Sequence, residues 1–273
     1  MRAGEPRDDR WLVALDVDGT VLHEDLSASI RVRRAVNAAV EAGHEVMLAT
    51  GRSAATALPV LEELRLSSEY VVCSNGAITM RRDPGSPLGY RREFVETFDP
   101  TEVLSTISGA LADARYAVED ELGFFRYTER FPSAAVGLAS EQVPFDALLG
   151  VKATRVVVIS PNHDMEEFLG VVERMGLHRV SYAVGWTAWL DIAPDGVNKA
   201  TALERVRDIL DVPRNRVLAV GDGRNDIEML EWAAEHGQGV AMGQAPADVR
   251  AAASAVTGPV ADDGLAQVLA ALI

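Results

Sequence analysis

The chain has 273 residues, of which 48% are hydrophobic and 25% charged, a balance typical of globular proteins and not of disordered ones. Its formal net charge of −15 argues against nucleic acids and anionic membranes as partners, because both would repel it. The single cysteine, Cys73, excludes an intramolecular disulfide, and no apolar run is long enough for a membrane helix. We therefore expect a cytoplasmic chain with one large domain or two joined domains.

The N-terminal part alternates between apolar strands and helices. Residues 11–18 form a nearly continuous apolar run that ends in acids, which predicts a strand buried on both faces. The elements predicted next are a helix ending at Gly43, a strand at 45–50, a helix to about Leu64 that is kinked or broken at Pro59, and a strand at 70–74. This β-α-β-α-β order predicts a doubly wound parallel sheet, as in Rossmann-like folds, with helices on both faces.

From about residue 77 the pattern changes to runs of strands beside helices, which predict an α+β module. Its predicted elements are a hairpin at 77–95, a helix near 100–114, strands near 115–119, 123–128 and 153–159, a helix at 164–175, and strands near 179–185 and 187–192. After Pro194 the alternation returns, with a helix at 198–210, a strand at 216–221, a helix at 225–235, a short strand at 239–241 and a last helix from about 263. We expect an α/β core, residues 1–82 and 192–273, with an α+β domain inserted at 83–191.

Two acids, Asp16 and Asp18, lie at the C-terminal end of the first predicted strand, in Asp16-Val17-Asp18-Gly19-Thr20. Strand alternation directs them to the same side, at the edge where open α/β sheets bind ligands. Such a pair can bind a hard cation through oxygen, or one acid can attack phosphorus while the other transfers protons. The alternative is an ordinary strand-to-turn exit rich in Asp and Gly, but this pattern after an apolar strand is specific.

Two weaker signals are Thr50-Gly51-Arg52 and Lys199. After a strand, the Thr50 hydroxyl and nearby N–H groups can bind phosphate oxygens, while Arg52 could add charge or pair with a surface acid. Lys199 falls in the first turn of a predicted helix, where the helix dipole disfavours a cation. A buried role beside carboxylates would explain this position, and a surface lysine is the alternative.

A further acidic segment, Gly221-Asp222-Gly223-Arg224-Asn225-Asp226, follows an apolar strand and opens a helix. A helix N-cap would explain one of its acids but not the flanking glycines. Asp16, Asp18 and Asp222 would come from two strands to one sheet edge, where they repel one another. A divalent cation between them resolves that repulsion.

In this order, the four segments resemble the motifs of the haloacid dehalogenase superfamily of phosphatases, and the chain resembles its Cof-type group, subfamily IIB. The resemblance covers nearly the whole chain. The matching segments are DVDGT, the Thr of LATGR, the Lys of GVNKATAL, GDGRNDIEML, Asn75-Gly76-Ala77 before the insert, Met242-Gly243-Gln244-Ala245 and Asp262-Asp263-Gly264-Leu265.

The resemblance implies a magnesium-dependent phosphatase for a small phosphorylated metabolite. Asp16 would be the nucleophile that forms an aspartyl-phosphate, and Asp18 would protonate the leaving alcohol and then activate water. Thr50 and Lys199 would hold the transferring phosphoryl group. The insert would be a cap that closes over the site and selects the substrate.

The resemblance also implies the ligands of the metal. Mg²⁺ would be bound by the Asp16 carboxylate, the Asp18 backbone carbonyl and Asp222, with Asn225 and Asp226 supporting it directly or through water. The expected substrate-binding positions are Gly51, Arg52, Asn75 and Gly76.

Two other functions stay open. A phosphosugar mutase would return the phosphate to a sugar instead of to water, although the GDGRND form favours a phosphatase. A non-catalytic phosphate-responsive module, such as a receiver domain, would be shorter and carry no insert. The default substrate is a sugar phosphate, with flavin mononucleotide and pyridoxal phosphate as alternatives. Glu119, Arg126 and Tyr127 are polar candidates on the strands of the insert, and the oligomeric state is open.

Overall fold

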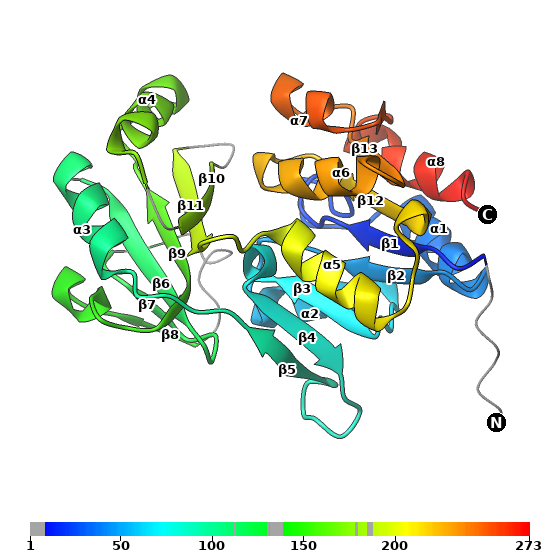
Figure 1. Ribbon diagram of the computed structural model, residues 1–273, viewed down its shortest axis with the longest axis horizontal. Coiled ribbons are helices and arrows are strands. Elements are labelled where there is room, and N and C mark those ends of the chain that lie inside the picture. Colours follow the sequence, from blue (N-terminus) through cyan, green and yellow to red (C-terminus); the bar gives the residue numbers. More distant parts are fainter. Residues whose placement is uncertain (1–8, 112, 130, 132–138, 178–179, 185–187) are drawn as a thin grey trace.

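The computed structural model describes residues 9–111, 113–129, 131, 139–177, 180–184 and 188–273. In Figure 1 the first and last parts of the chain, coloured blue to cyan and yellow to red, form one group of elements, and the middle part, in green, forms another. Within the described residues, no helix has the length and apolar character needed to span a membrane.

Five parallel strands form the central sheet of the first group, in the order β14-β13-β12-β1-β2. Their bounds are β1 (Leu12–Leu15), β2 (Glu45–Leu48), β12 (Val217–Gly221), β13 (Gln238–Ala241) and β14 (Ala255–Val256). β1 pairs in register with β12 on one side and β2 on the other, and it is buried throughout. Burial on both faces explains its unbroken apolar sequence. β3 (Tyr70–Cys73) lies beside β2 through the parallel bridge Ala49–Val72.

Helices cover both faces of this sheet. Successive β1 residues point to opposite sides and therefore pack against different helices. Val13 and Leu15 belong to one apolar cluster, with α1 (Ile30–Glu41), α2 (Ala54–Leu64) and α8 (Gly264–Ala270). Leu12 and Ala14 belong to another, with α5 (Lys199–Ile209) and α6 (Ile227–Ala234). α7 (Ala247–Ala252) packs against α6 and β13.

Of the two outcomes expected at Pro59, a kink or two short helices, the second is wrong, because α2 is a single helix from Ala54 to Leu64. The buried side chains of α2, which include Leu58, Leu61 and Leu64, hold it against the sheet although proline removes one backbone hydrogen bond.

A hairpin follows β3, as the sequence predicts for residues 77–95. Its strands β4 (Ile78–Arg82) and β5 (Tyr90–Val95) are antiparallel, and β4 also pairs with β3 in a three-stranded sheet. β5 thus extends the sheet of β3 and β4, although residues 90–95 fall within the expected insert, 83–191.

The middle of the chain forms a six-stranded sheet, here named the cap sheet, in the order β10-β11-β9-β6-β7-β8. Its strands are β6 (Arg115–Asp120), β7 (Phe125–Tyr127), β8 (Ser140–Gln142), β9 (Ala153–Ile159), β10 (Val180–Val184) and β11 (Trp189–Pro194). One face carries Val118 and Val156 and packs against α3 (Thr101–Ala110) and α4 (Met165–Met175). Together these elements are named the cap. The fold class predicted from the sequence, a parallel α/β core with an α+β cap, is confirmed.

Short 3-10 turns complete the structure: η1 (Ser74–Gly76), η2 (Phe145–Leu148), η3 (Arg214–Arg216), η4 (Arg224–Asp226) and η5 (Val260–Asp262). η1 follows β3 and η4 follows β12. Both therefore lie at the carboxyl edge of the parallel strands, where β/α folds place their ligands.

Candidate active site

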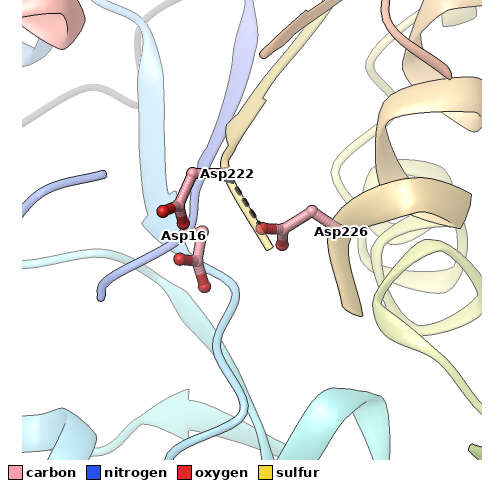
Figure 2. Close-up of side chains that lie close together, drawn as sticks. All are labelled: Asp16, Asp222 and Asp226. Carbon is pink, nitrogen blue, oxygen red and sulfur yellow. Dashed lines mark hydrogen bonds between the residues drawn. The ribbon is translucent and has the colours of Figure 1, made fainter. Parts of the chain in front are cut away.

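Four residues from three segments of the chain meet at the carboxyl ends of β1 and β12. Asp16 directly follows β1, Asp222 directly follows β12, Asp226 ends η4 and Lys199 begins α5. Figure 2 shows the three carboxylates close together. One oxygen from each lies within 4.8 Å of the others, and all three residues are buried.

Lys199 is the cation of this cluster. Its Nζ donates to Asp16 Oδ1 and to Asp226 Oδ1, both at 2.6 Å, and only 1% of the residue is exposed. Asn198 caps α5 by accepting the N–H of Thr201, which fixes the first helical turn and with it the start of the lysine side chain. Burial alone would lower the pKa of Lys199, but the two carboxylates raise it above its ordinary value, so the ammonium stays charged.

Burial and mutual repulsion raise the pKa values of two of these acids, Asp16 and Asp222. Burial raises the pKa of Asp16 well above its ordinary value and Asp226 raises it further, while Lys199 opposes the shift. Burial and the Asp226 charge raise the pKa of Asp222 to about 7. The cluster therefore presents more negative charge than Lys199 balances, and its donors are the oxygen ligands that a hard divalent cation prefers.

Asp226 holds the cluster together through backbone contacts. Its Oδ2 accepts the N–H groups of Asp222 at 3.0 Å, drawn as a dashed line in Figure 2, and of Gly223 at 2.9 Å. Both oxygens of Asp226 are thus engaged by the chain itself, because Lys199 takes the other.

Asp18 lies at the rim of the site and not within the three-acid cluster. Its side chain is 56% exposed and pairs with Arg52, whose Nε lies 2.8 Å from Asp18 Oδ2. Asp16, Asp222 and Asp226 therefore form the cluster, whereas the sequence analysis grouped Asp18 with Asp16 and Asp222. Gly19 follows with φ +79°, and a Cβ at this position would overlap the Asp222 carboxylate.

Thr50 and Asn75 belong to a second group of candidate residues, joined by hydrogen bonds. Thr50 Oγ1 accepts the Arg52 N–H at 3.1 Å, and the Thr50 carbonyl accepts the Asn75 N–H at 3.1 Å. Asn75 Oδ1 in turn accepts from Asn225 Nδ2 at 3.0 Å. Gly51 lies against this group, because a Cβ there would be 3.0 Å from Asn75 Oδ1. Hydrogen bonds thus join the Thr50-Gly51-Arg52 segment to η1 and η4.

Gly76 connects the loop to the lysine helix. It has φ +102°, and a Cβ at Gly76 would overlap the backbone carbonyl of Asn198. The expected position Gly76 therefore packs on the residue that caps α5, beside Lys199.

Gln244 is a site residue that the sequence analysis did not assign. Its Nε2 donates to the Gly19 carbonyl at 2.6 Å and to Asp222 Oδ2 at 3.1 Å, while its Oε1 accepts the Val260 N–H. It thereby ties the exit of β1 to Asp222. The available signal was its position just after β13, whose carboxyl end lies at the same sheet edge.

The cap contributes to the surroundings of the site. A cavity of about 30 Å³ is lined by Asn75, Lys199 and Asn225 from the core and by Ser181 and Asp191 from the cap, among others. Asp191 is held by Arg155 Nε at 2.6 Å and by Trp189 Nε1 at 3.0 Å.

The three polar candidates of the cap have different environments. Glu119 accepts from Ser74 of the core, Arg126 binds Asp120 within the cap sheet, and Tyr127 packs edge-on against Phe131. Glu119 therefore links the two parts of the molecule, whereas the contacts found for Arg126 and Tyr127 stay inside the cap.

Comparisons with known proteins identify the family of the chain. A family model described as haloacid dehalogenase-like hydrolase matches residues 13–269. The curated protein 5-amino-6-(5-phospho-D-ribitylamino)uracil phosphatase YitU of Bacillus subtilis is 28% identical over 270 residues, which cover 95% of this chain and 96% of YitU. Pyridoxal phosphate phosphatase YbhA of Escherichia coli is 28% identical over 277 residues, with coverages of 94% and 96%.

The fold has solved counterparts. A structure titled as the HAD subclass IIB sugar phosphatase BT4131 has a TM-score of 0.80 at 21% identity, with 96% of this chain and 100% of that chain covered. This likeness agrees with the Cof-type, subfamily IIB resemblance, and the family match over nearly the whole chain confirms the superfamily. The chain thus belongs to the haloacid dehalogenase-like hydrolases, and it is a phosphatase.

Proposed function

We propose that this phosphatase is a magnesium-dependent phosphomonoester hydrolase that acts on a small phosphorylated metabolite through an aspartyl-phosphate on Asp16. The observation that carries the proposal is the buried contact of Asp16 with Lys199, beside Asp222 and Asp226. Lys199 opposes the rise in the pKa of Asp16 and so favours the ionised form, which is the nucleophilic one.

The donor set fits a divalent cation. Three clustered carboxylates and one ammonium leave an excess of negative charge, and burial makes that excess unfavourable. Asp16, Asp222 and the Asp18 carbonyl would hold Mg²⁺. Asp226 would act mainly as a support, because its oxygens already accept three N–H bonds, and Asn225 would lie in the same outer layer. When bound, Mg²⁺ neutralises charge on the transferring phosphoryl group.

Asp16 would attack the phosphorus, forming an Asp16 O–P bond as the bond from phosphorus to the leaving oxygen breaks. Asp18 would give its proton to the leaving alkoxide. It would then take a proton from water, whose oxygen attacks the aspartyl-phosphate and releases inorganic phosphate and free Asp16. Thr50, Gly51 and Lys199 would hold the phosphoryl oxygens during both steps. Arg52 would orient Asp18 for the second step, when Asp18 has released its proton and can form the ion pair seen in the structure.

The proposed substrate class is a sugar phosphate, and the proposed location is the cytoplasm. Ser181, Asp191 and Asn75 around the cavity can donate to or accept from hydroxyl groups, which supports a polyhydroxylated leaving group. The names of YitU and YbhA also refer to small phosphorylated molecules, one carrying a phosphoribityl group and one being pyridoxal phosphate.

The test is phosphate release from a panel of sugar phosphates, flavin mononucleotide and pyridoxal phosphate, ranked by kcat/KM with Mg²⁺. Release should stop with EDTA and fall by at least about 10³-fold in Asp16→Asn, because the covalent path is lost. Absence of phosphate release from every member would reject the hydrolase. Conversion of a hexose 1-phosphate to its 6-phosphate without free phosphate would instead identify a mutase.

A further inference from the structure

Glu119 joins the cap sheet to the core at a buried point. It lies on β6 and is fully buried, and its Oε2 accepts the Ser74 hydroxyl at 2.7 Å. Its Oε1 has no hydrogen-bond partner among the described residues. A buried oxygen without a hydrogen bond costs free energy, and an apolar side chain at position 119 would not have that cost. We therefore attribute the carboxyl group to function and not to packing.

Charged groups surround Glu119 on both sides of the junction. Arg155 is its cross-strand neighbour on β9, and Arg92 approaches from β5 and donates to the Leu122 carbonyl. Burial raises the pKa of Glu119, the two arginines lower it, and Asp191 raises it. The Ser74 hydroxyl of the core is thus bound by a cap residue, Glu119, which itself lies among other charged side chains.

Ser74 begins an unusual turn. Ser74 has φ +48° and Asn75 has φ +53°, so two successive non-glycine residues adopt the left-handed conformation. Such a backbone persists only where its surroundings hold it. The turn is also bound to the Thr50-Gly51-Arg52 segment. The Ser74 N–H donates to the Arg52 carbonyl at 2.8 Å, and the Asn75 N–H donates to the Thr50 carbonyl.

We infer that Glu119 is a positioning residue for the phosphatase site. By accepting a hydrogen bond from the Ser74 hydroxyl, it holds the left-handed turn. The turn itself holds Thr50 for the phosphoryl group, Arg52 for Asp18 and Asn75 at the cavity. Glu119 touches no reacting atom. The inference rests on the proposed function for the roles of Thr50 and Asn75, and it makes the cap responsible for part of the geometry of the core.

Kinetics test this connection in a double-mutant cycle. With p-nitrophenyl phosphate and Mg²⁺, Ser74→Ala and Glu119→Ala should each lower kcat/KM roughly tenfold, about what the loss of one hydrogen bond produces. The double variant should be no worse than the poorer single variant, because both changes break the same contact. Glu119→Gln should keep most of the activity, since its carbonyl oxygen can still accept from Ser74.

Amide hydrogen exchange at Ser74 and Asn75 supplies a readout that does not need activity. Exchange should be at least roughly tenfold faster in Ser74→Ala and Glu119→Ala, and close to wild type in Glu119→Gln. The matched control is Tyr116→Phe, which removes a buried cap hydrogen bond to the Leu111 carbonyl on the opposite face of β6 from Glu119. It should lower Tm without changing kcat/KM or the two exchange rates.

The outcomes separate the two proposals. Wild-type exchange at both amides in Glu119→Ala would overturn the inference, as would effects on kcat/KM that multiply in the double variant. A wild type that releases no phosphate, with exchange that still follows the Glu119–Ser74 contact, would reject the proposed hydrolase and leave the positioning of the turn supported.

Discussion

Lys199 Nζ lies 2.6 Å from Asp16 Oδ1, although 183 positions separate the two residues in the chain. The contact requires β1 and α5 to meet at one sheet edge, so it can form only in the folded core. The pair proposed to act in catalysis therefore also stabilises the fold. Stability and catalysis should therefore fail together when this contact is removed.

Replacing Lys199 with methionine should remove the ammonium while keeping a similar length. Asp16 and Asp226 would then be buried without their cation, and the free energy of unfolding should fall by about 3 kcal/mol or more at pH 8. Phosphate release should fall by at least roughly 10³-fold, because Asp16 loses the cation that favours its ionised form and the phosphoryl group loses a positive partner. Urea unfolding and an activity assay measure both. The exposed Lys152→Met is the control, and a fully active Lys199→Met would contradict the proposed role.

The metal-free protein should lose stability from Asp222 as the pH rises from about 3.8 to about 7. The folded state raises the pKa of Asp222 from 3.8 to about 7, so it retains a proton that the unfolded chain has already released. The folded form is therefore favoured at the acid end of this window and disfavoured at its upper end. With EDTA, the stability of Asp222→Asn relative to wild type should increase from pH 5 to pH 8.

Magnesium should reverse this trend, since a cation that binds only the folded carboxylates stabilises them most where they are ionised. Urea midpoints at several pH values, with and without Mg²⁺, measure the effect. A wild type and an Asp222→Asn variant that follow parallel pH curves would show that Asp222 does not titrate in this range.

Gln244→Leu should weaken magnesium binding by roughly 10–100-fold, because ligands without their outer partners lose orientation. Gln244 donates to Asp222 and to the Gly19 carbonyl, so its loss loosens both the acid and the turn after β1. Activity at saturating Mg²⁺ should largely recover. Titration of activity against Mg²⁺ measures the shift, and the exposed Gln267→Leu should titrate as wild type does. An unchanged midpoint in Gln244→Leu would remove Gln244 from the site.

Arg52→Lys should lower kcat/KM by roughly tenfold or more while changing the free energy of unfolding by less than about 1 kcal/mol. The Asp18 partner is more than half exposed, so solvent screens the pair and stability depends little on it. Lysine keeps the charge but cannot form both contacts of the guanidinium, which leaves Asp18 less fixed. Arg205→Lys, which alters the exposed pair with Glu96, is the control. Equal kcat/KM values for the two variants would exclude the orienting role.

Much of the core was predictable because its strands are buried on both faces. The runs at Leu12–Leu15 and Val217–Gly221 have no polar alternation, and the acids that follow them mark where the strands end. Since parallel strands end at a common edge, the meeting of Asp16 with Asp222 follows from the pattern.

Other contacts depend on packing that no local pattern encodes. The sequence left Arg52 without a defined partner, and the ion pair with Asp18 arises only when two strand exits come side by side. Glu119 shows the same limit, since alternation places it on one face of β6 but does not tell which part of the core that face meets. Gln244 lies after a strand in a segment of small residues, where only the fold reveals its contact with Asp222.

The overlap that a side chain at Gly76 would make with Asn198 has a consequence for engineering. The segment between Gly76 and Asn198 begins and ends at adjacent positions in the structure. A segment that replaces it therefore needs two ends that lie close together. A relative's stretch in place of residues 77–197 should leave Asp16, Asp222 and Lys199 in position, provided that it supplies strands equivalent to β4 and β5 and an acceptor for the Ser74 hydroxyl in place of Glu119. Such chimaeras offer a route to transplant selectivity while the reactive machinery stays the same.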